Sequence, residues 1–130
     1  MSDEYPSELR YTQEHEWARL DGNVATIGIT RFAVEQLGDI TMVDLPKEGE
    51  ALQKGAVFGT VESVKAVSDL FAPCSGKVLK VNDPLSDTPE TVNEDCYDEG
   101  WMIQVELSDT KELADLMSAQ QYEEYLKEHG

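Results

Sequence analysis

The apolar residues of this chain occur in short runs, and glycine, proline, asparagine or aspartate ends nearly every run after a few positions. Short runs that are rich in β-branched and aromatic residues favour strands joined by turns. A chain made mainly of short strands buries one face of each strand in a sandwich or a barrel. We therefore expect a mainly β fold, a small two-sheet sandwich or barrel with helices packed outside.

Length and hydrophobic content are typical of a single folded unit. The chain has 130 residues, of which 40% are hydrophobic, so it is long enough to bury a core. We expect one domain over residues 1–130, with residues 1–8 flexible. The acidic start has neither an apolar signal-peptide region nor the arginine-rich composition of a transit peptide. This favours a bacterial cytoplasmic protein, or a mitochondrial-matrix protein if the chain is a processed eukaryotic form.

The expected strands follow from the runs themselves. Asp21-Gly22-Asn23 separates the first two runs, and glycine there supplies the positive φ of a tight hairpin turn. In the last run apolar and polar residues nearly alternate, which is typical of a strand with one buried face. That face would carry Trp101, Ile103, Val105 and Leu107. The expected strands cover residues 17–20, 24–29, 40–45, 57–61, 67–71, 78–81 and 101–107.

Helices are expected near residue 30 and at the end of the chain. Thr30 can cap a short helix that runs through Leu37 and stops at Gly38, so we expect a helix near residues 30–37. The acidic stretch 82–100 is rich in turn residues, and its prolines exclude long regular elements.

The C-terminal segment has helical spacing. Residues 110–117 place leucines and a methionine on one helical face, which predicts one helix. Ser118 and Gln121 have the spacing of a capping box, which predicts the start of another. The second helix would present Tyr122, Tyr125 and Leu126 on one face.

The chain is strongly acidic, with 27 acidic against 10 basic residues and a formal net charge of −17. Nucleic acids and anionic membranes are polyanions, and no apolar run is long enough to span a membrane, so we expect neither as a partner. The charge is uneven: residues 24–82 are nearly neutral, whereas residues 83–99 contain no basic residue. Such acidic segments keep a protein soluble or steer it toward basic partners, and the sequence leaves both functions open. We expect a monomer.

Motifs of the common enzyme classes are missing. The chain has no glycine-rich nucleotide-binding motif, no P-loop and no nucleophile elbow. We interpret His15 as a structural or surface residue and His129 as part of a frayed terminus. Cys74 and Cys96 lie far apart with no metal-ligand spacing, so we expect reduced thiols, although a disulfide stays open. These absences favour a binding or carrier protein without a metal over an enzyme.

Lys65 stands apart from the other lysines because β-rich runs flank it on both sides. This position predicts a hairpin tip, where a side chain projects into solvent and a modifying enzyme can reach it. An ordinary solvated turn lysine fits the same pattern, so the residues alone leave both interpretations open.

The segment Val61-Glu62-Ser63-Val64-Lys65-Ala66 resembles the lipoylation site of glycine cleavage system H proteins. Further motifs of that family follow in unbroken order over roughly residues 9–126. Gly49 and Gly76 also fit the lipoyl-domain pattern, one before the lysine and one after it. The other matching segments are 11–17, 25–30, 35–40, 44–46, 68–70, 72–73, 75–76, 81–82, 92–93 and 100–103.

The resemblance implies a barrel-sandwich hybrid of the lipoyl/biotinyl-carrier type, with (R)-lipoate joined to Lys65 through an amide bond. The protein would then be a carrier and the cofactor would supply the chemistry. The resemblance places the recognition hairpin around this lysine, at Glu62, Ser63, Val64 and Ala66.

The resemblance also implies the partner enzymes. A pyridoxal-phosphate-dependent glycine decarboxylase (P protein) would load the aminomethyl group of glycine, and a folate-dependent aminomethyltransferase (T protein) would unload it. Dihydrolipoyl dehydrogenase (L protein) would reoxidise the arm, and a lipoate ligase or an octanoyl/lipoyl transferase would attach it. Glu16 and Asp69 are candidates for holding the cationic amine when the loaded arm docks on the carrier. The alternative is that both are exposed carboxylates at strand ends.

Other functions compete with this one. Some H-like proteins donate lipoate to 2-oxoacid dehydrogenase complexes, and that function needs Lys65 as well. A biotin carrier is disfavoured because biotin carriers place methionine on both sides of the lysine, whereas Val64 and Ala66 flank it here. A stand-alone enzyme has no supporting motif.

Overall fold

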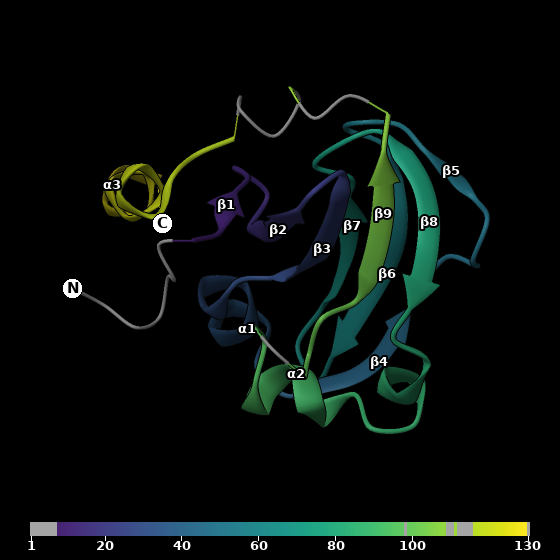
Figure 1. The fold of residues 1–130 in the computed structure, drawn as a ribbon. Coiled ribbons are helices and arrows are strands. Elements are labelled where there is room, and N and C mark those ends of the chain that lie inside the picture. Colours follow the sequence, from purple (N-terminus) through teal and green to yellow (C-terminus); the bar gives the residue numbers. More distant parts are fainter. Residues whose placement is uncertain (1–7, 98, 109–110, 112–115, 130) are drawn as a thin grey trace.

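Two antiparallel sheets form the body of the protein (Figure 1). The computed structural model describes residues 8–97, 99–108, 111 and 116–129. One sheet has six strands in the order β1-β2-β3-β9-β8-β5, and the other has three in the order β4-β6-β7. The predicted mainly β, two-sheet fold is therefore confirmed. Residues 1–7, most of the segment expected to be flexible, lie outside the described residues.

Most elements lie where the sequence predicts them, whereas β1 and β5 were not predicted because two residues are too few to show a periodicity. The strands are β1 (Arg10–Tyr11), β2 (Glu16–Asp21), β3 (Val24–Ile29), β4 (Ile40–Asp44), β5 (Ala51–Leu52), β6 (Val57–Ser63), β7 (Val67–Phe71), β8 (Gly76–Val81) and β9 (Ile103–Leu107). The helices are α1 (Arg31–Leu37), α2 (Glu90–Glu94) and α3 (Ala119–His129), with a short 3-10 helix η1 (Asp83–Ser86).

Helix α1 begins and ends as its sequence predicts. The Thr30 side chain accepts a hydrogen bond from the backbone N–H of Ala33 at 3.3 Å, which satisfies one free donor of the first turn. Gly38 follows the last turn with φ +80°, a conformation that side chains disfavour, and its N–H donates to the carbonyl of Val34.

Strand β9 begins at Ile103, two residues later than predicted. The carbonyl of Trp101 accepts a hydrogen bond from the Asn82 side chain at 2.7 Å instead of pairing with a strand. Pairing of β9 with β3 starts at Ile27, opposite Ile103. The expected alternation therefore holds only from Ile103 onward, where Val105 is also fully buried.

The prediction of a helix over residues 110–117 is wrong at its last residue. Met117 lies in an extended bridge with Tyr11, and each residue's N–H donates to the other's carbonyl. Residues 109–110 and 112–115 lie outside the described part of the chain. The capping box is confirmed, because Ser118 and Gln121 exchange hydrogen bonds of 2.9 and 3.2 Å across the start of α3.

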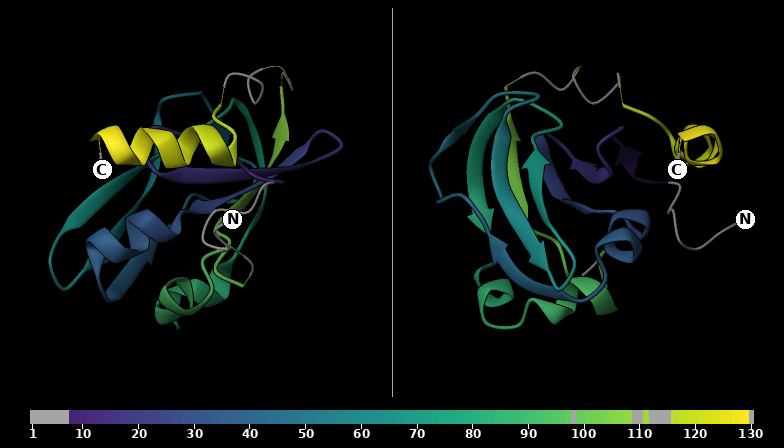
Figure 2. Two further views of the ribbon diagram at one scale, coloured as in Figure 1. Left: turned by 90° about the vertical axis from the view of Figure 1, so that its left-hand side faces the viewer. Right: turned by 180° about the vertical axis from the view of Figure 1, so that it is seen from behind.

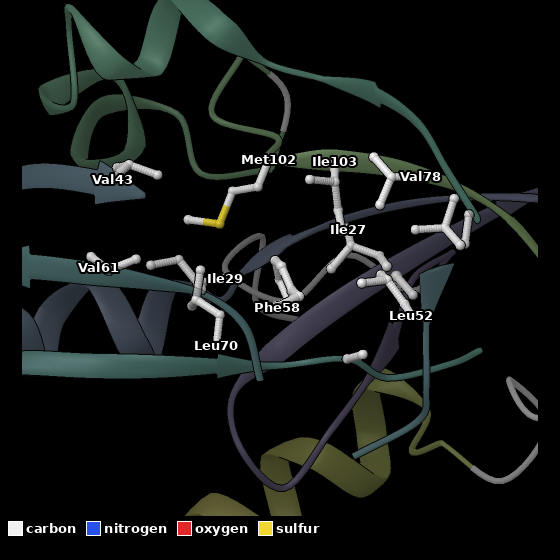
Figure 3. Packing of buried hydrophobic residues seen from close by; sticks show 14 of the residues in the cluster. Ile27, Ile29, Val43, Leu52, Phe58, Val61, Leu70, Val78, Met102 and Ile103 are labelled. Carbon is white, nitrogen blue, oxygen red and sulfur yellow. The ribbon is translucent and has the colours of Figure 1, made fainter. Parts of the chain in front are cut away.

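The main core lies between the two sheets (Figure 3). Each fully buried aliphatic side chain of this kind contributes about 1.5–3 kcal/mol relative to its exposed state. The inward residues come from both sheets and include Ile27, Ile29, Val43, Leu52, Phe58, Val61, Leu70, Val78, Met102 and Ile103.

Helix α3 lies along the β1–β2 edge of the six-stranded sheet (Figure 2), and a second, aromatic cluster of buried residues joins the two. The rings of Tyr11 and Tyr122 stack at 4.8 Å, and both are fully buried. Trp17 is buried beside them, and its indole N–H donates to the carbonyl of Cys96 at 2.9 Å. The aromatic face predicted for α3 thus covers β1 and β2.

Candidate functional site

Lys65 lies at the tip of the hairpin formed by β6 and β7. The hydroxyl of Ser63 accepts hydrogen bonds from the backbone N–H groups of Lys65 and Ala66, both at 3.1 Å. The N–H of Ser63 donates to the carbonyl of Ala66 at 2.8 Å and closes the turn. Serine suits this position because its short side chain can bond to the backbone of the residues that follow. The lysine is exposed, as the sequence predicts for a hairpin tip.

The tip is fastened to the segment between α1 and β4. The N–H of Val64 donates to the carbonyl of Asp39 at 3.2 Å. The amide side chain of Asn93, in α2, accepts from the N–H of Ile40 and donates to the carbonyl of Gly38, both at 2.8 Å. Asn93 thereby holds the segment that holds the hairpin. The contacts of Asn93 were not predictable from the sequence, because nothing in its local pattern indicates a partner more than fifty residues away.

The lysine side chain lies against Gly38. A Cβ added to this glycine would lie 3.4 Å from Cε of Lys65, a distance at the limit of ordinary contact. Gly38 therefore serves two purposes: it ends α1 with a positive φ, and it leaves room for the lysine stem.

The predicted recognition residues surround Lys65. Glu62, Ser63, Val64 and Ala66 are all partly or fully exposed, whereas Val61 is fully buried and anchors β6 in the core. Val64 is 69% exposed, which is unusual for a valine and leaves its side chain in solvent at the tip.

Glu16 is not an exposed strand-end carboxylate, because only 1% of its surface is accessible. Its Oε1 accepts from the Thr12 hydroxyl at 2.7 Å, and its Oε2 accepts from the N–H of Phe71 at 3.1 Å. Burial raises the pKa of Glu16 to about 8, although these two hydrogen bonds oppose the shift, and the charge of nearby Glu14 adds to it. Loss of hydration is the larger effect, so the carboxyl group is mostly protonated at neutral pH.

A cavity of about 280 Å³ opens beside this carboxyl group. Its walls include Tyr11, Thr12, Glu16, Phe71, Pro73 and Met117. Asp69 is exposed and does not line the cavity, but it lies two residues before Phe71 on the same face of β7. Both candidate carboxylates therefore lie beside β7: Glu16, on β2, accepts from Phe71 at the cavity, and Asp69, on β7 itself, lies outside the cavity.

The outer face of β7 leads from the lysine toward the cavity. Val67, Asp69 and Phe71 alternate with inward residues and so share this face. A strand rises ~3.3 Å per residue, so Val67 and Phe71 are roughly 13 Å apart. An extended chain attached to Lys65 could follow this face to the cavity.

His15 has a structural position. Its Nδ1 lies 2.8 Å from the hydroxyl of Tyr122, which lies 2.8 Å from the hydroxyl of Thr30. Burial lowers the pKa of His15, and its backbone has a positive φ of 71°. The residue links α3 to the cap of α1, in agreement with the structural interpretation of this histidine.

Both cysteines, Cys74 and Cys96, are buried thiols that are not joined in a disulfide, in agreement with the expected reduced state. Within the described part of the chain there is no cluster of three or more residues that could hold a metal ion. Among the described helices, none has the length and apolar character needed to cross a membrane.

Comparison with known proteins gives one consistent result. The family model described as Glycine cleavage H-protein matches residues 9–129. A glycine cleavage system H protein of Anaeromyxobacter sp. (strain K) is 59% identical over 125 residues, covering 96% of this chain and 98% of that protein. The one of Staphylococcus saprophyticus is 54% identical over 123 residues, covering 95% and 98%. The crystal structure of a glycine cleavage system H protein from Mycobacterium marinum superposes with a TM-score of 0.84 at 38% identity, covering 96% of this chain and 98% of the other.

Proposed function

This chain belongs to the glycine cleavage H-protein family, and we propose that Lys65 is the residue to which its lipoyl group is attached. Its function is that of the lipoyl carrier of glycine cleavage. The observation that carries the assignment of the site is the exposed lysine at a hairpin tip that Ser63 and Asp39 hold in place. A tip of this kind presents the Nζ of the lysine to another enzyme without unfolding either strand.

Attachment requires the unprotonated Nζ of Lys65 as the nucleophile. The nitrogen attacks the carbonyl carbon of an activated lipoyl group such as an acyl-adenylate, forming a C–N bond. The bond from that carbon to the adenylate oxygen breaks, AMP leaves, and the nitrogen loses a proton. The product is an amide, so the modification removes one positive charge from the hairpin. The attached dithiolane then supplies the disulfide that accepts the aminomethyl group.

The residues around the lysine fit such an arm. The hydrocarbon chain of the arm matches the half-apolar face of β7, and the cavity beyond Phe71 is lined mostly by apolar residues. Its charged lining residues are Glu14, Glu16 and Lys54. We assign Glu16, inside this cavity, and Asp69, at its approach, to hold the cationic amine of the loaded arm. A cation next to Glu16 would favour its carboxylate form and so reverse the effect of burial on the pKa.

A carrier of this kind works by visiting larger enzymes. Its proposed partners are the glycine decarboxylase, the aminomethyltransferase and the dihydrolipoyl dehydrogenase, together with the lipoate ligase or octanoyl/lipoyl transferase that modifies Lys65. The protein catalyses none of these steps by itself, since the reacting atoms belong to the cofactor and to the partner sites. The relatives described above are bacterial, which supports a location in the bacterial cytoplasm.

The test is intact-mass analysis after incubation with a purified lipoate–protein ligase, lipoate and ATP. We expect the wild-type protein to gain one lipoyl mass and Lys65→Ala to gain none. Lys80→Ala is the matched control, because it removes another exposed strand-associated lysine and should still be modified. A lipoyl mass on Lys65→Ala would show that the site lies elsewhere.

A further inference from the structure

We propose that the outer face of the three-stranded sheet, next to Lys65, is the surface on which the enzyme that attaches the lipoyl group docks. The complementary surface of that enzyme is apolar at its centre and basic around it. This inference rests on the proposed function, because it concerns the reaction at the same lysine.

The register of the strands defines the face. Met42, Glu62 and Val67 lie opposite one another on β4, β6 and β7 and form the outward row of all three strands that is nearest the hairpin tip. The next row consists of Asp44, Thr60 and Asp69. Between the two rows lies the inward pair Val43 and Val61, so both rows point away from the core.

This face exposes large apolar side chains. Val67 is 65% and Met42 is 47% exposed, and Val64 extends the apolar surface at the tip. Six large hydrophobic residues are exposed among the described ones, and these three lie on the Lys65 hairpin or on the strand paired with it. In the view from behind, no described helix covers the sheet (Figure 2). Exposed apolar side chains that gather around one functional residue indicate an interaction site.

Apart from Lys65 at the tip, the charged side chains of this face are all negative. The three strands contain the carboxylates Asp44, Glu62 and Asp69 and no lysine, arginine or histidine. None of these carboxylates forms an ion pair with a described residue. A partner that covers the face therefore has to neutralise three negative charges, and arginine or lysine side chains around an apolar centre would do so.

The position of the reacting atom selects the enzyme that docks here. The attaching enzyme must bring its activated carboxyl carbon within bonding distance of Nζ of Lys65, so its surface has to contact the hairpin and the adjacent row. Enzymes that act on the far end of the attached arm work at a distance of a whole arm from the backbone. Adjacent strands are ~4.8 Å apart, so the backbone of Met42 on β4 lies roughly 10 Å from that of Val67 on β7, in the same row.

The face and the lysine also form one rigid unit. The N–H of Val64 bonds to Asp39, and Asn93 fixes Gly38 and Ile40 on either side of that residue. An enzyme that binds the β4 end of the row therefore also fixes the position of the hairpin tip. Strand β4 and the tip are both attached to the segment 38–40.

The test compares two glutamine substitutions of equal exposure. Met42 lies on the proposed face, whereas Leu20 lies on β2 in the other sheet, and each is 47% exposed. The measured quantity is kcat/KM for lipoylation by a purified lipoate–protein ligase with lipoate and ATP, followed by intact mass. We expect Met42→Gln to lower it about fivefold or more, mainly through KM, and Leu20→Gln to leave it unchanged.

A second pair of variants tests the charge. Asp44→Asn with Glu62→Gln removes two carboxylates from the face, and Asp21→Asn with Glu106→Gln removes two from the six-stranded sheet. We expect the first pair to flatten the fall of kcat/KM with rising salt, and the second pair to keep the wild-type dependence. Circular dichroism and the thermal midpoint verify that each variant is folded.

Three outcomes would overturn the inference. Equal lipoylation kinetics of Met42→Gln and Leu20→Gln would show that the face is not contacted. A Met42→Gln variant that is lipoylated normally but reacts poorly with a glycine cleavage enzyme would assign the face to that enzyme instead. Equal salt dependence of the two charge pairs would remove the basic partner surface. Failure of the proposed function is distinguishable, because the wild-type protein would then gain no lipoyl mass at all.

Discussion

Glu16 shows how the surroundings of one residue change its chemistry. The side chain accepts two hydrogen bonds that suit a carboxylate, yet burial of the carboxyl group outweighs them and raises its pKa from 4.5 to about 8. The folded protein therefore holds the proton of Glu16 more tightly than the unfolded chain does. The resulting contribution to stability is complete below pH 4.5, where both states are protonated. As the pH rises toward 8 the unfolded chain loses its proton first, so the stabilisation is lost.

We expect the substitution Glu16→Gln to remove this pH dependence. The free energy of unfolding of the wild-type protein, relative to the variant, should fall by about 1.4 kcal/mol per pH unit between the two pKa values. Urea denaturation of both proteins at about pH 5 and about pH 8 measures the difference. Glu14→Gln is the control: it removes a nearby charge that raises the pKa of Glu16 but keeps the buried carboxyl group, so most of the dependence should remain. A difference between wild type and Glu16→Gln that is independent of pH would contradict the raised pKa.

At the scale of elements, the hairpin depends on a helix that is distant in sequence. Helix α2 has only five residues, but its Asn93 bridges the backbone on both sides of Asp39, which in turn bonds to Val64 at the tip. The position of Lys65 is therefore set jointly by the β6–β7 turn and by this contact with α2.

We expect Asn93→Ala to loosen the tip. Loss of the amide leaves the N–H of Ile40 and the carbonyl of Gly38 without their partner, at a cost of about 1–3 kcal/mol. Hydrogen exchange of the Val64 amide should accelerate, because its acceptor segment is no longer fixed. Asn82→Ala is a matched control, since Asn82 also bridges two backbone groups away from the hairpin, here by donating to the carbonyls of Glu99 and Trp101. Equal exchange of Val64 in the two variants would rule out this role of Asn93.

The elements show which features were predictable from sequence. The start and end of α1 and the start of α3 follow from caps that lie within a few residues, Thr30, Gly38 and Ser118, and all three are confirmed. The extended bridge of Met117 was missed because its helical spacing is a local signal, whereas its partner Tyr11 lies more than a hundred residues away. Local patterns predict local structure, and pairing over long distances needs the folded chain.

At the scale of the whole molecule, the acidic charge favours brief, steered encounters. The formal net charge is −17, while the segment 24–82 that contains the lysine hairpin is nearly neutral. Attraction between exposed charges accelerates association and is screened by salt, so a carrier that serves several enzymes can meet each one quickly without binding it tightly.

We expect this steering to be measurable. The second-order rate constant for oxidation of the reduced lipoylated protein by dihydrolipoyl dehydrogenase should fall as the salt concentration rises from about 0.05 M to about 0.5 M. Free dihydrolipoamide serves as the control, because it lacks the acidic carrier and its rate should change little. Equal salt dependence of the two substrates would mean that the acidic residues only keep the protein soluble.

The sequence by itself determined the longer strands, the capped helix after Thr30 and the family motif around Lys65, because periodicity, caps and a contiguous motif are properties of neighbouring residues. Only the tertiary structure decided that Glu16 is buried against Phe71, that Asn93 fastens the hairpin, and that Met42 lies in the row beside the lysine. Each of these depends on strand register or on burial. Both arise from packing between segments far apart in the chain, and no local pattern of residues specifies which segments will meet.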